Sequence, residues 1–193
     1  MIIKEECDGK TDEELAYLTL KDEDYYLCLM QRYEEKLLRY IHRISGLFEK
    51  DAQDILQETF IKVYKNLNDF DKKLKFSSWI YRIAHNEVIS NWRKRKARPK
   101  MIFIEDNDFL ESLSSEFTTD IHLEKKYKKE TVKKVLKNLD QKYKEILELK
   151  YLEQKDYKEI SDILKIPMGS VATLLNRARE RFKKEVKEKN ITF

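Results

Sequence analysis

The chain has 193 residues but only three glycines and two prolines, about a quarter of the usual share. A sheet-rich domain needs glycine at its turns, and the sequence contains neither a phosphate-binding glycine loop nor a Rossmann fingerprint. Charged residues make up 39% of the chain and hydrophobic residues 41%, enough to bury one or two small cores. These numbers predict an all-α protein of two small helical domains.

No stretch of the sequence suggests a membrane segment, a metal site or a catalytic centre. The longest apolar runs last three or four residues and the N-terminus has no signal-peptide core, so we expect no membrane insertion and a cytoplasmic location. Cys7 and Cys28 are unclustered, which suggests neither a disulfide framework nor a zinc site. No Ser/His/Asp or Cys/His constellation can be assembled, so we expect neither an enzyme nor a bound cofactor.

The formal net charge of +4 is unevenly distributed. Residues 101–124 contain seven acids and no Lys or Arg, which leaves +11 on the rest of the chain. We therefore expect two basic bodies joined by a flexible acidic linker.

In the first body, side-chain spacing predicts four helices. Thr11 and Glu14 form a capping box for the first helix. The second covers about residues 24–45 and ends at Gly46. The third is the clearest, with apolar residues at spacings of three and four: Ala52, Ile55, Leu56, Thr59, Phe60, Val63 and Leu67. The fourth is expected to be capped by Ser77.

The second body is expected to resume helical structure near Leu123 and to present an amphipathic face between residues 135 and 147. A shorter helix covers residues 157–164, and Ser170 is expected to cap the last one. These two helices match a helix-turn-helix, in which Ser161 takes the small site between them. We expect Ile160, Leu164, Ile166, Val171 and Leu174 to face inward, and Ser170, Ala172, Thr173, Asn176 and Arg177 to face outward.

Two features of this motif bear on its interpretation. A second helix of this kind enters the major groove with its N-terminal half against the bases, although an αα-hairpin without a nucleic-acid role is the alternative. Lys165 occupies the turn where glycine is usual, and a positive φ there costs about 1 kcal/mol.

Two further faces are less specific. The basic run formed by Arg93, Lys94, Arg95, Lys96, Arg98 and Lys100 follows several aromatic residues, a combination that suits single-stranded nucleic acid. Such a run is also an ordinary solvated helix end, and Trp79 is better placed for a core than for base stacking. The outward face of the third helix, with Asp51, Asp54, Gln57, Glu58 and Lys62, reads as an ordinary polar surface.

Two long motifs resemble bacterial sigma factors. Residues 51–60 (DAQDILQETF), 66–70 (NLNDF) and 76–86 (FSSWIYRIAHN) are similar to their promoter-melting domain. Residues 166–171 (IPMGSV) and 176–179 (NRAR) are similar to the minus-35-reading domain of the extracytoplasmic-function (ECF) subfamily. The resemblance covers about residues 11–186. It implies a sigma region 2-like domain at 11–98, an acidic linker at 99–127 and a sigma region 4-like domain at 128–188.

The resemblance assigns roles to residues of the first domain. The face formed by Asp54, Gln57, Glu58 and Phe60 would dock on the clamp helices of core RNA polymerase. Flipping a base out of the minus-10 element costs a few kcal/mol, and a shaped pocket would make this opening selective. The minus-10 contacts implied are Asn66, Phe70, Trp79, Tyr81, Asn86, Arg93, Lys94 and Arg95.

In the second domain the resemblance implies contacts with duplex minus-35 DNA and with the polymerase flap. The DNA contacts implied are Tyr157, Lys158, Ser170, Thr173, Asn176 and Arg177. The family usually carries basic residues where this chain has Ala172 and Leu174, so we expect weaker phosphate contact there. Leu139, Ile146 and Leu147 would form the core and border the flap contact.

The implied function is promoter-specific initiation as a polymerase subunit, with an anti-sigma protein as its regulator. The alternative is a stand-alone helix-turn-helix regulator that acts without polymerase recruitment. A third possibility is a basic helical bundle that binds nucleic acid nonspecifically. Its binding would depend strongly on salt and would not discriminate between sequences.

Overall fold

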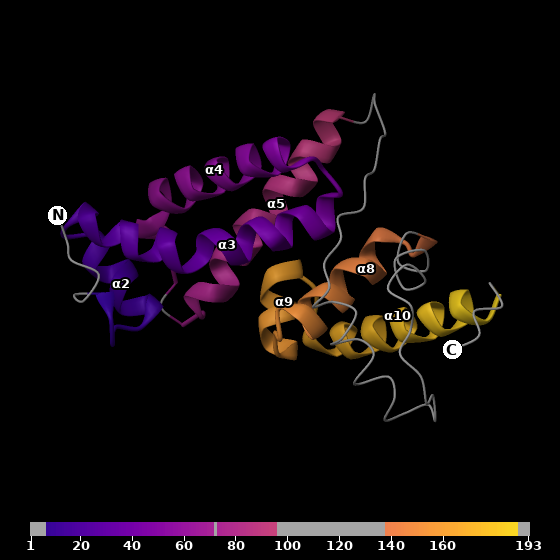
Figure 1. The fold of residues 1–193 in the computed structure, drawn as a ribbon. Helices are drawn as coiled ribbons and strands as arrows, with labels where there is room; N and C mark the ends of the chain where they lie inside the picture. The colour runs from indigo at the N-terminus through magenta and orange to yellow at the C-terminus, as the bar shows by residue number, and fades with distance from the viewer. Residues whose placement is uncertain (1–6, 72, 96–137, 189–193) are drawn as a thin grey trace. The chain divides into compact units, whose positions relative to one another are not determined.

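The computed structural model describes residues 7–71, 73–95 and 138–188, which contain helices and no strand. The chain divides into two compact units, one built on helices α2 to α5 and the other on α8 to α10, and each is described by itself (Figure 1). The expectation of an all-α protein with two small helical domains is confirmed. None of the helices in the described ranges is long and apolar enough to cross a membrane.

The first unit begins with α2 (Asp12–Thr19), a short 3₁₀ turn (Glu23–Tyr25) and α3 (Tyr26–Ser45). The predicted capping box is present, because the Glu14 amide donates to the Thr11 hydroxyl at 3.1 Å and the Thr11 amide donates to the Glu14 carboxylate at 2.7 Å. Gly46 ends α3 with φ +64° and donates its N–H to the His42 carbonyl at 2.9 Å. Glycine suits this left-handed cap because it has no Cβ.

Helices α4 (Glu49–Lys65) and α5 (Phe76–Arg95) complete the first unit, with a 3₁₀ turn (Leu67–Asp69) between them. All seven residues of the predicted stripe on α4 and at its end are buried. The prediction that Ser77 caps α5 is wrong, because the helix begins at Phe76. The Phe76 amide instead donates at 2.8 Å to the carboxylate of Glu13, which comes from α2. A residue distant in sequence thus satisfies an amide that has no partner within the helix.

The second unit consists of α8 (Gln141–Leu147), a π-helical turn (Glu148–Leu152), α9 (Tyr157–Leu164) and α10 (Met168–Glu188). Leu139, Ile146 and Leu147 are buried in its core. The helix expected near Leu123 and the amphipathic positions before residue 138 lie outside the described residues. The prediction that Ser170 caps the last helix is wrong, because α10 begins two residues earlier at Met168.

A tight turn joins α9 to α10, as the sequence predicted. Lys165 adopts φ +55° and ψ +42°, the left-handed conformation that a glycine usually supplies. The Ser161 hydroxyl donates to the Ile166 carbonyl at 2.6 Å, so the small residue at this site also ties the turn together. Of the predicted inward residues, Ile160 and Val171 are buried, while Leu164, Ile166 and Leu174 are half-buried.

The cysteines do not behave as their spacing suggested. Cys7 and Cys28 form a disulfide with a Cα–Cα distance of 5.9 Å. Their separation of 21 residues carries no motif, because it depends on how the segment before α2 folds back along α3. The expectation of two unclustered thiols is therefore wrong.

Replacing Lys165 with glycine should stabilise the second unit. The Lys165→Gly variant removes the Cβ that opposes a left-handed backbone and should gain about 0.5–1 kcal/mol, after the greater entropy of the unfolded glycine is subtracted. Urea unfolding followed by circular dichroism measures this change. Both tryptophans, Trp79 and Trp92, lie in the first unit, so tryptophan fluorescence should report an unchanged transition there. Lys165→Ala keeps the Cβ and should show no gain; an equal gain in both variants would contradict the backbone explanation.

Candidate nucleic-acid interface

An aromatic cluster stands where the loop after α4 enters α5. The Phe70 ring centroid lies 5.5 Å from that of Phe76 and 5.3 Å from that of Trp79, and the last two lie 5.7 Å apart. Phe76 and Trp79 are buried, whereas Phe70 remains half-buried. Trp79 therefore supports the cluster from below, as the sequence indicated, and Phe70 is the member whose ring reaches the surface.

The other residues expected at the minus-10 element differ in their exposure. Asn66 is exposed at the end of α4, and its side-chain amide donates to the Lys62 carbonyl at 2.7 Å. Tyr81 is 2% exposed and packs on Tyr40 with ring centroids 5.0 Å apart. Tyr81 thus belongs to the interior of the bundle and can act on DNA only through the shape of α5.

One stripe of α5 connects the aromatic cluster to the basic end of the helix. Trp79, Asn86 and Arg93 follow one another at seven-residue intervals, which places them along one helix face with about 10 Å between successive members. Asn86 and Arg93 are exposed. Arg82, at i+3 from Trp79, is half-buried on the same stripe, and sequence reasoning missed it because it stands outside the basic run.

The end of this stripe is only partly described. Lys94 is exposed and Trp92 is half-buried. The side chain of Arg95 and the remaining cations of the basic run lie outside the described residues.

A second face of the first unit combines acids with exposed apolar side chains. Asp54, Gln57 and Glu58 are exposed on α4. The first and last of these line a shallow cleft between α4 and α5, at which Lys62 and Glu87 form an ion pair of 2.6 Å. Phe60 was expected on this surface, but its side chain is buried and its ring lies 6.4 Å from Tyr26 in an edge-to-face arrangement.

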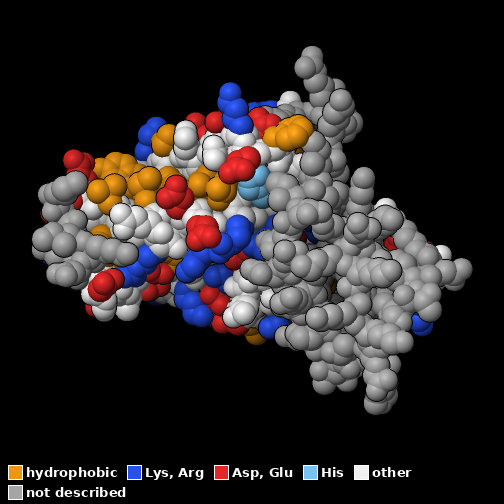
Figure 2. All heavy atoms as spheres, viewed as in Figure 1, with side chains coloured by type: hydrophobic (Ala, Val, Ile, Leu, Met, Phe, Trp, Pro, Cys, Tyr) orange, Lys and Arg blue, Asp and Glu red, His pale blue; other side chains and the backbone are white. Residues whose placement is uncertain are grey.

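The apolar part of this face was not singled out from the sequence. Ile61 and Tyr64 on α4 are 46% and 44% exposed, and Leu27 on α3 is 52% exposed. Figure 2 shows hydrophobic side chains gathered over the part of the first unit where α3 and α4 run side by side. Ile61 follows Glu58 by three residues, so an acid and an apolar side chain share one face of α4, as at a protein interface with an apolar centre and a polar rim. The sequence did contain a signal for this surface, because Ile61 and Tyr64 are large apolar residues that lie outside the buried stripe of α4.

In the second unit, α10 presents the predicted polar residues to solvent. Ser170, Thr173, Asn176 and Arg177 are all exposed over its first three turns, whereas Ala172 is half-buried. Tyr157 and Lys158 are exposed at the start of α9. Because Ser170, Thr173 and Arg177 follow at spacings of three and four, they lie on one face of the helix.

The helix that carries this face is held by side chains behind it. Arg179 Nε donates to the Tyr151 hydroxyl at 2.6 Å, which joins α10 to the π-helical turn. The Lys150 ammonium lies 5.7 Å from the Tyr157 ring centroid. The side of α10 opposite the exposed polar row is thus held in the second unit by the Arg179 hydrogen bond and by burial of Val171 and Leu175.

Among the described residues, no group of three or more His, Cys, Asp and Glu side chains could hold a metal ion. The described residues provide an exposed polar row on a helix-turn-helix, and an aromatic cluster beside a cationic stripe of α5 that is formed by Arg82 and Arg93. The first feature suits a DNA major groove, and the second suits a separated nucleic-acid strand.

Comparisons with known proteins identify the family. The family model for sigma-70 region 2 matches residues 29–98, and the model for sigma-70 region 4 matches residues 129–182. The ECF RNA polymerase sigma factor SigW of Bacillus subtilis is 32% identical over 86% of this chain and 91% of its own length. The RNA polymerase sigma factor YlaC of the same organism is 29% identical over 86% of this chain and 95% of its own. The chain belongs to the ECF sigma factors of the sigma-70 family, which are transcription initiation factors and not enzymes.

Two solved structures share the fold. CnrH, determined in complex with the cytosolic domain of CnrY, has a TM-score of 0.66 and 20% identity, and the match covers 93% of this chain and 99% of the other. The sigma factor RpoE of Bartonella quintana, determined with the anti-sigma factor NepR, has a TM-score of 0.62 and 19% identity, with coverages of 82% and 94%.

Proposed function

We propose that this chain binds core RNA polymerase in the cytoplasm and directs initiation at promoters by reading a minus-35 and a minus-10 element. The observation that carries the proposal is the pairing of two DNA-directed features in one chain. One is the exposed row on α10, which suits duplex DNA in a major groove. The other is the aromatic cluster beside the cationic stripe of α5, which suits a separated strand.

The proposed domains are a region 2-like domain at 11–98, a linker at 99–127 and a region 4-like domain at 128–188. In the second domain, Ser170, Thr173, Asn176 and Arg177 read the minus-35 bases, because all four are exposed on the N-terminal half of the recognition helix. Tyr157 and Lys158 contact phosphates at the start of α9. The linker lies outside the described residues.

In the first domain, Phe70 stacks on an unpaired base of the minus-10 element while Trp79 and Tyr81 hold α5 beneath it. Asn66 and Asn86 supply hydrogen bonds, and the exposed cations of the α5 stripe follow the strand. This division is supported by burial. The residues proposed to touch DNA are exposed, except Phe70, which is half-buried, whereas Trp79 and Tyr81, which shape the helix, are buried.

The face of α4 meets the polymerase clamp helices. Asp54, Gln57 and Glu58 contribute polar contacts, Ile61 and Tyr64 contribute apolar area, and Phe60 supports the helix from the interior. An anti-sigma protein is the proposed regulator. RpoE, which has the same fold, was determined in complex with the anti-sigma factor NepR, and CnrH was determined in complex with the cytosolic domain of CnrY.

Run-off transcription with purified core polymerase on a library of two-box promoters tests the proposal. We expect initiation only when this chain and core enzyme are both present, with selection at both boxes. High-affinity operator binding without polymerase, together with no initiation in its presence, would support a stand-alone regulator instead. Binding that falls steeply with salt but does not discriminate between sequences would indicate a nonspecific basic bundle.

The Asn86→Ala variant should impair initiation on duplex promoters more than it impairs binding to core polymerase. Asn86 is exposed on α5 and its loss leaves the buried faces of the helix intact, so the deficit should fall on strand separation. Transcription from duplex and pre-opened templates, beside a polymerase-binding titration, measures the difference. Equal loss of polymerase binding and of initiation would show that Asn86 is structural.

The Arg177→Ala variant should lose about 1–3 kcal/mol of discrimination at one minus-35 base. The measurement is relative initiation across promoters that differ singly at each minus-35 position. Arg181→Ala is the matched control, since Arg181 is the same residue type one turn further along α10 and pairs with Glu185 at 3.7 Å. A uniform loss on all sequences would assign Arg177 to a phosphate.

A further inference from the structure

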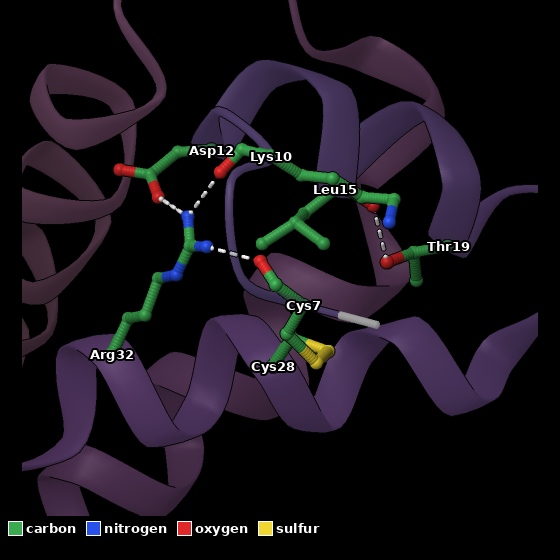
Figure 3. The surroundings of a disulfide bond; sticks show 7 residues. All are labelled: Cys7, Lys10, Asp12, Leu15, Thr19, Cys28 and Arg32. Atoms are coloured by element: carbon green, nitrogen blue, oxygen red, sulfur yellow. Dashed lines mark hydrogen bonds and ion pairs between the residues drawn. A yellow bond between two sulfur atoms is a disulfide. The ribbon is translucent and has the colours of Figure 1, made fainter. Parts of the chain in front are cut away.

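Residues 7–11, which precede α2, are attached to α3 by a covalent bond and by a cluster of hydrogen bonds. Cys7 joins Cys28, and the Arg32 guanidinium one turn further along α3 donates to the Cys7 carbonyl at 2.6 Å and the Lys10 carbonyl at 2.9 Å (Figure 3). The same guanidinium pairs with the Asp12 carboxylate at 2.8 Å. These contacts hold the residues before α2 against the same stretch of α3 that carries Cys28.

The surroundings of Cys28 favour thiol–disulfide chemistry. Cys28 is the third residue of the 20-residue helix α3, and its sulfur lies against Cys7, the only other cysteine of the chain. The Arg32 cation lies one turn away on the same face. Both cysteines are buried when joined, with 8% and 3% exposure, and the chain contains no other cysteine to compete with this pair.

A chain of contacts leads from this bond to the aromatic cluster. Asp12, held by Arg32, also accepts a hydrogen bond from the Tyr33 hydroxyl. The Tyr33 ring packs against the Phe76 ring, with centroids 5.7 Å apart. Glu13, the neighbour of Asp12, accepts the hydrogen bond of the Phe76 amide at the start of α5. Movement of the first turn of α2 therefore acts on the residue that supports Phe70 and Trp79.

We propose that Cys7 and Cys28 are a reversible redox site, and that their oxidation fixes the start of α2 on α3 and thereby holds Glu13 at the start of α5. Disulfides in cytoplasmic proteins are usually transient or redox-sensing rather than structural. This step rests on the proposed cytoplasmic function. The oxidant is of the low-molecular-weight disulfide class, because a compact reagent can reach the pair once the segment before α2 opens.

Oxidation proceeds by thiol–disulfide exchange. The Cys28 thiolate attacks one sulfur of the external disulfide and expels one thiolate. The Cys7 thiolate then attacks the Cys28 sulfur of the mixed disulfide and expels the second. The protein loses two electrons and two protons, and one external disulfide becomes two thiols. Reduction by a small dithiol or by two thiol molecules reverses each step.

The first test requires no polymerase. The full chain is equilibrated in mixtures of reduced and oxidised glutathione, and its thiols are counted by alkylation and mass spectrometry. We expect conversion between a two-thiol and a no-thiol monomer. Hydrogen exchange of the α2 amides should be about tenfold slower in the oxidised form, since the bond suppresses local opening. Persistent thiols, disulfide-linked dimers, or equal α2 exchange in both forms would overturn the proposal.

The second test links the site to promoter opening. Oxidised or reduced chain, freed of reagent, is mixed with core polymerase on duplex and pre-opened templates. The oxidised form should initiate severalfold better on the duplex, with little difference on the pre-opened template. Cys7→Ser, treated identically, should show no redox dependence and should match the reduced chain. An equal response of Cys7→Ser, or equal duplex initiation by both forms of the natural chain, would overturn the link. Failure to initiate in either form would contradict the proposed function, while thiol counts and α2 exchange would still decide the redox site.

Discussion

Burial of Phe76 is the constraint on which the first unit depends. This residue is fully buried, and its ring contacts those of Tyr33, Phe70 and Trp79. Its backbone amide is the first of α5 and is satisfied by Glu13. One residue thus joins α2, α3, the loop after α4 and the helix that carries the cationic stripe. If Phe76 were displaced, its amide would lose the Glu13 carboxylate and the Phe70 ring would lose a packing partner. The order of the surface around Phe70 therefore depends on this buried contact.

In the second unit, the orientation of α10 depends on the turn that precedes it. Its recognition helix must begin at a fixed angle to α9, and the turn between them contains no glycine to adopt the left-handed conformation. Lys165 adopts it instead, while Ser161 donates to the Ile166 carbonyl across the turn. Behind the exposed row, Arg179 ties α10 to Tyr151. The local strain at one residue is thus offset by bonds on both sides of it, and the exposed polar row keeps its orientation.

Local pattern predicted most of the elements because their causes are local. The stripe from Ala52 to Leu67, the Thr11–Glu14 capping box and the stop at Gly46 each depend on residues of one helix and its immediate ends. The two failed cap assignments show the limit of this reasoning. Ser77 and Ser170 have the chemistry of helix caps, but the helices begin earlier, at Phe76 because Glu13 comes from another helix, and at Met168 because the turn following Lys165 leads directly into α10.

The amino-acid order alone was sufficient for the all-helical class, the uneven charge, the helix-turn-helix and the polar residues on its outer face, because each follows from composition or from spacing along a single helix. It could not show the Cys7–Cys28 bond, the attachment of α2 by Arg32, the burial of Phe60 and Tyr81, or the exposed apolar group around Ile61. These depend on which helices meet and at what angle. Contacts between residues far apart in sequence have no periodic signature, since they arise only when the separate amphipathic faces pack into one core.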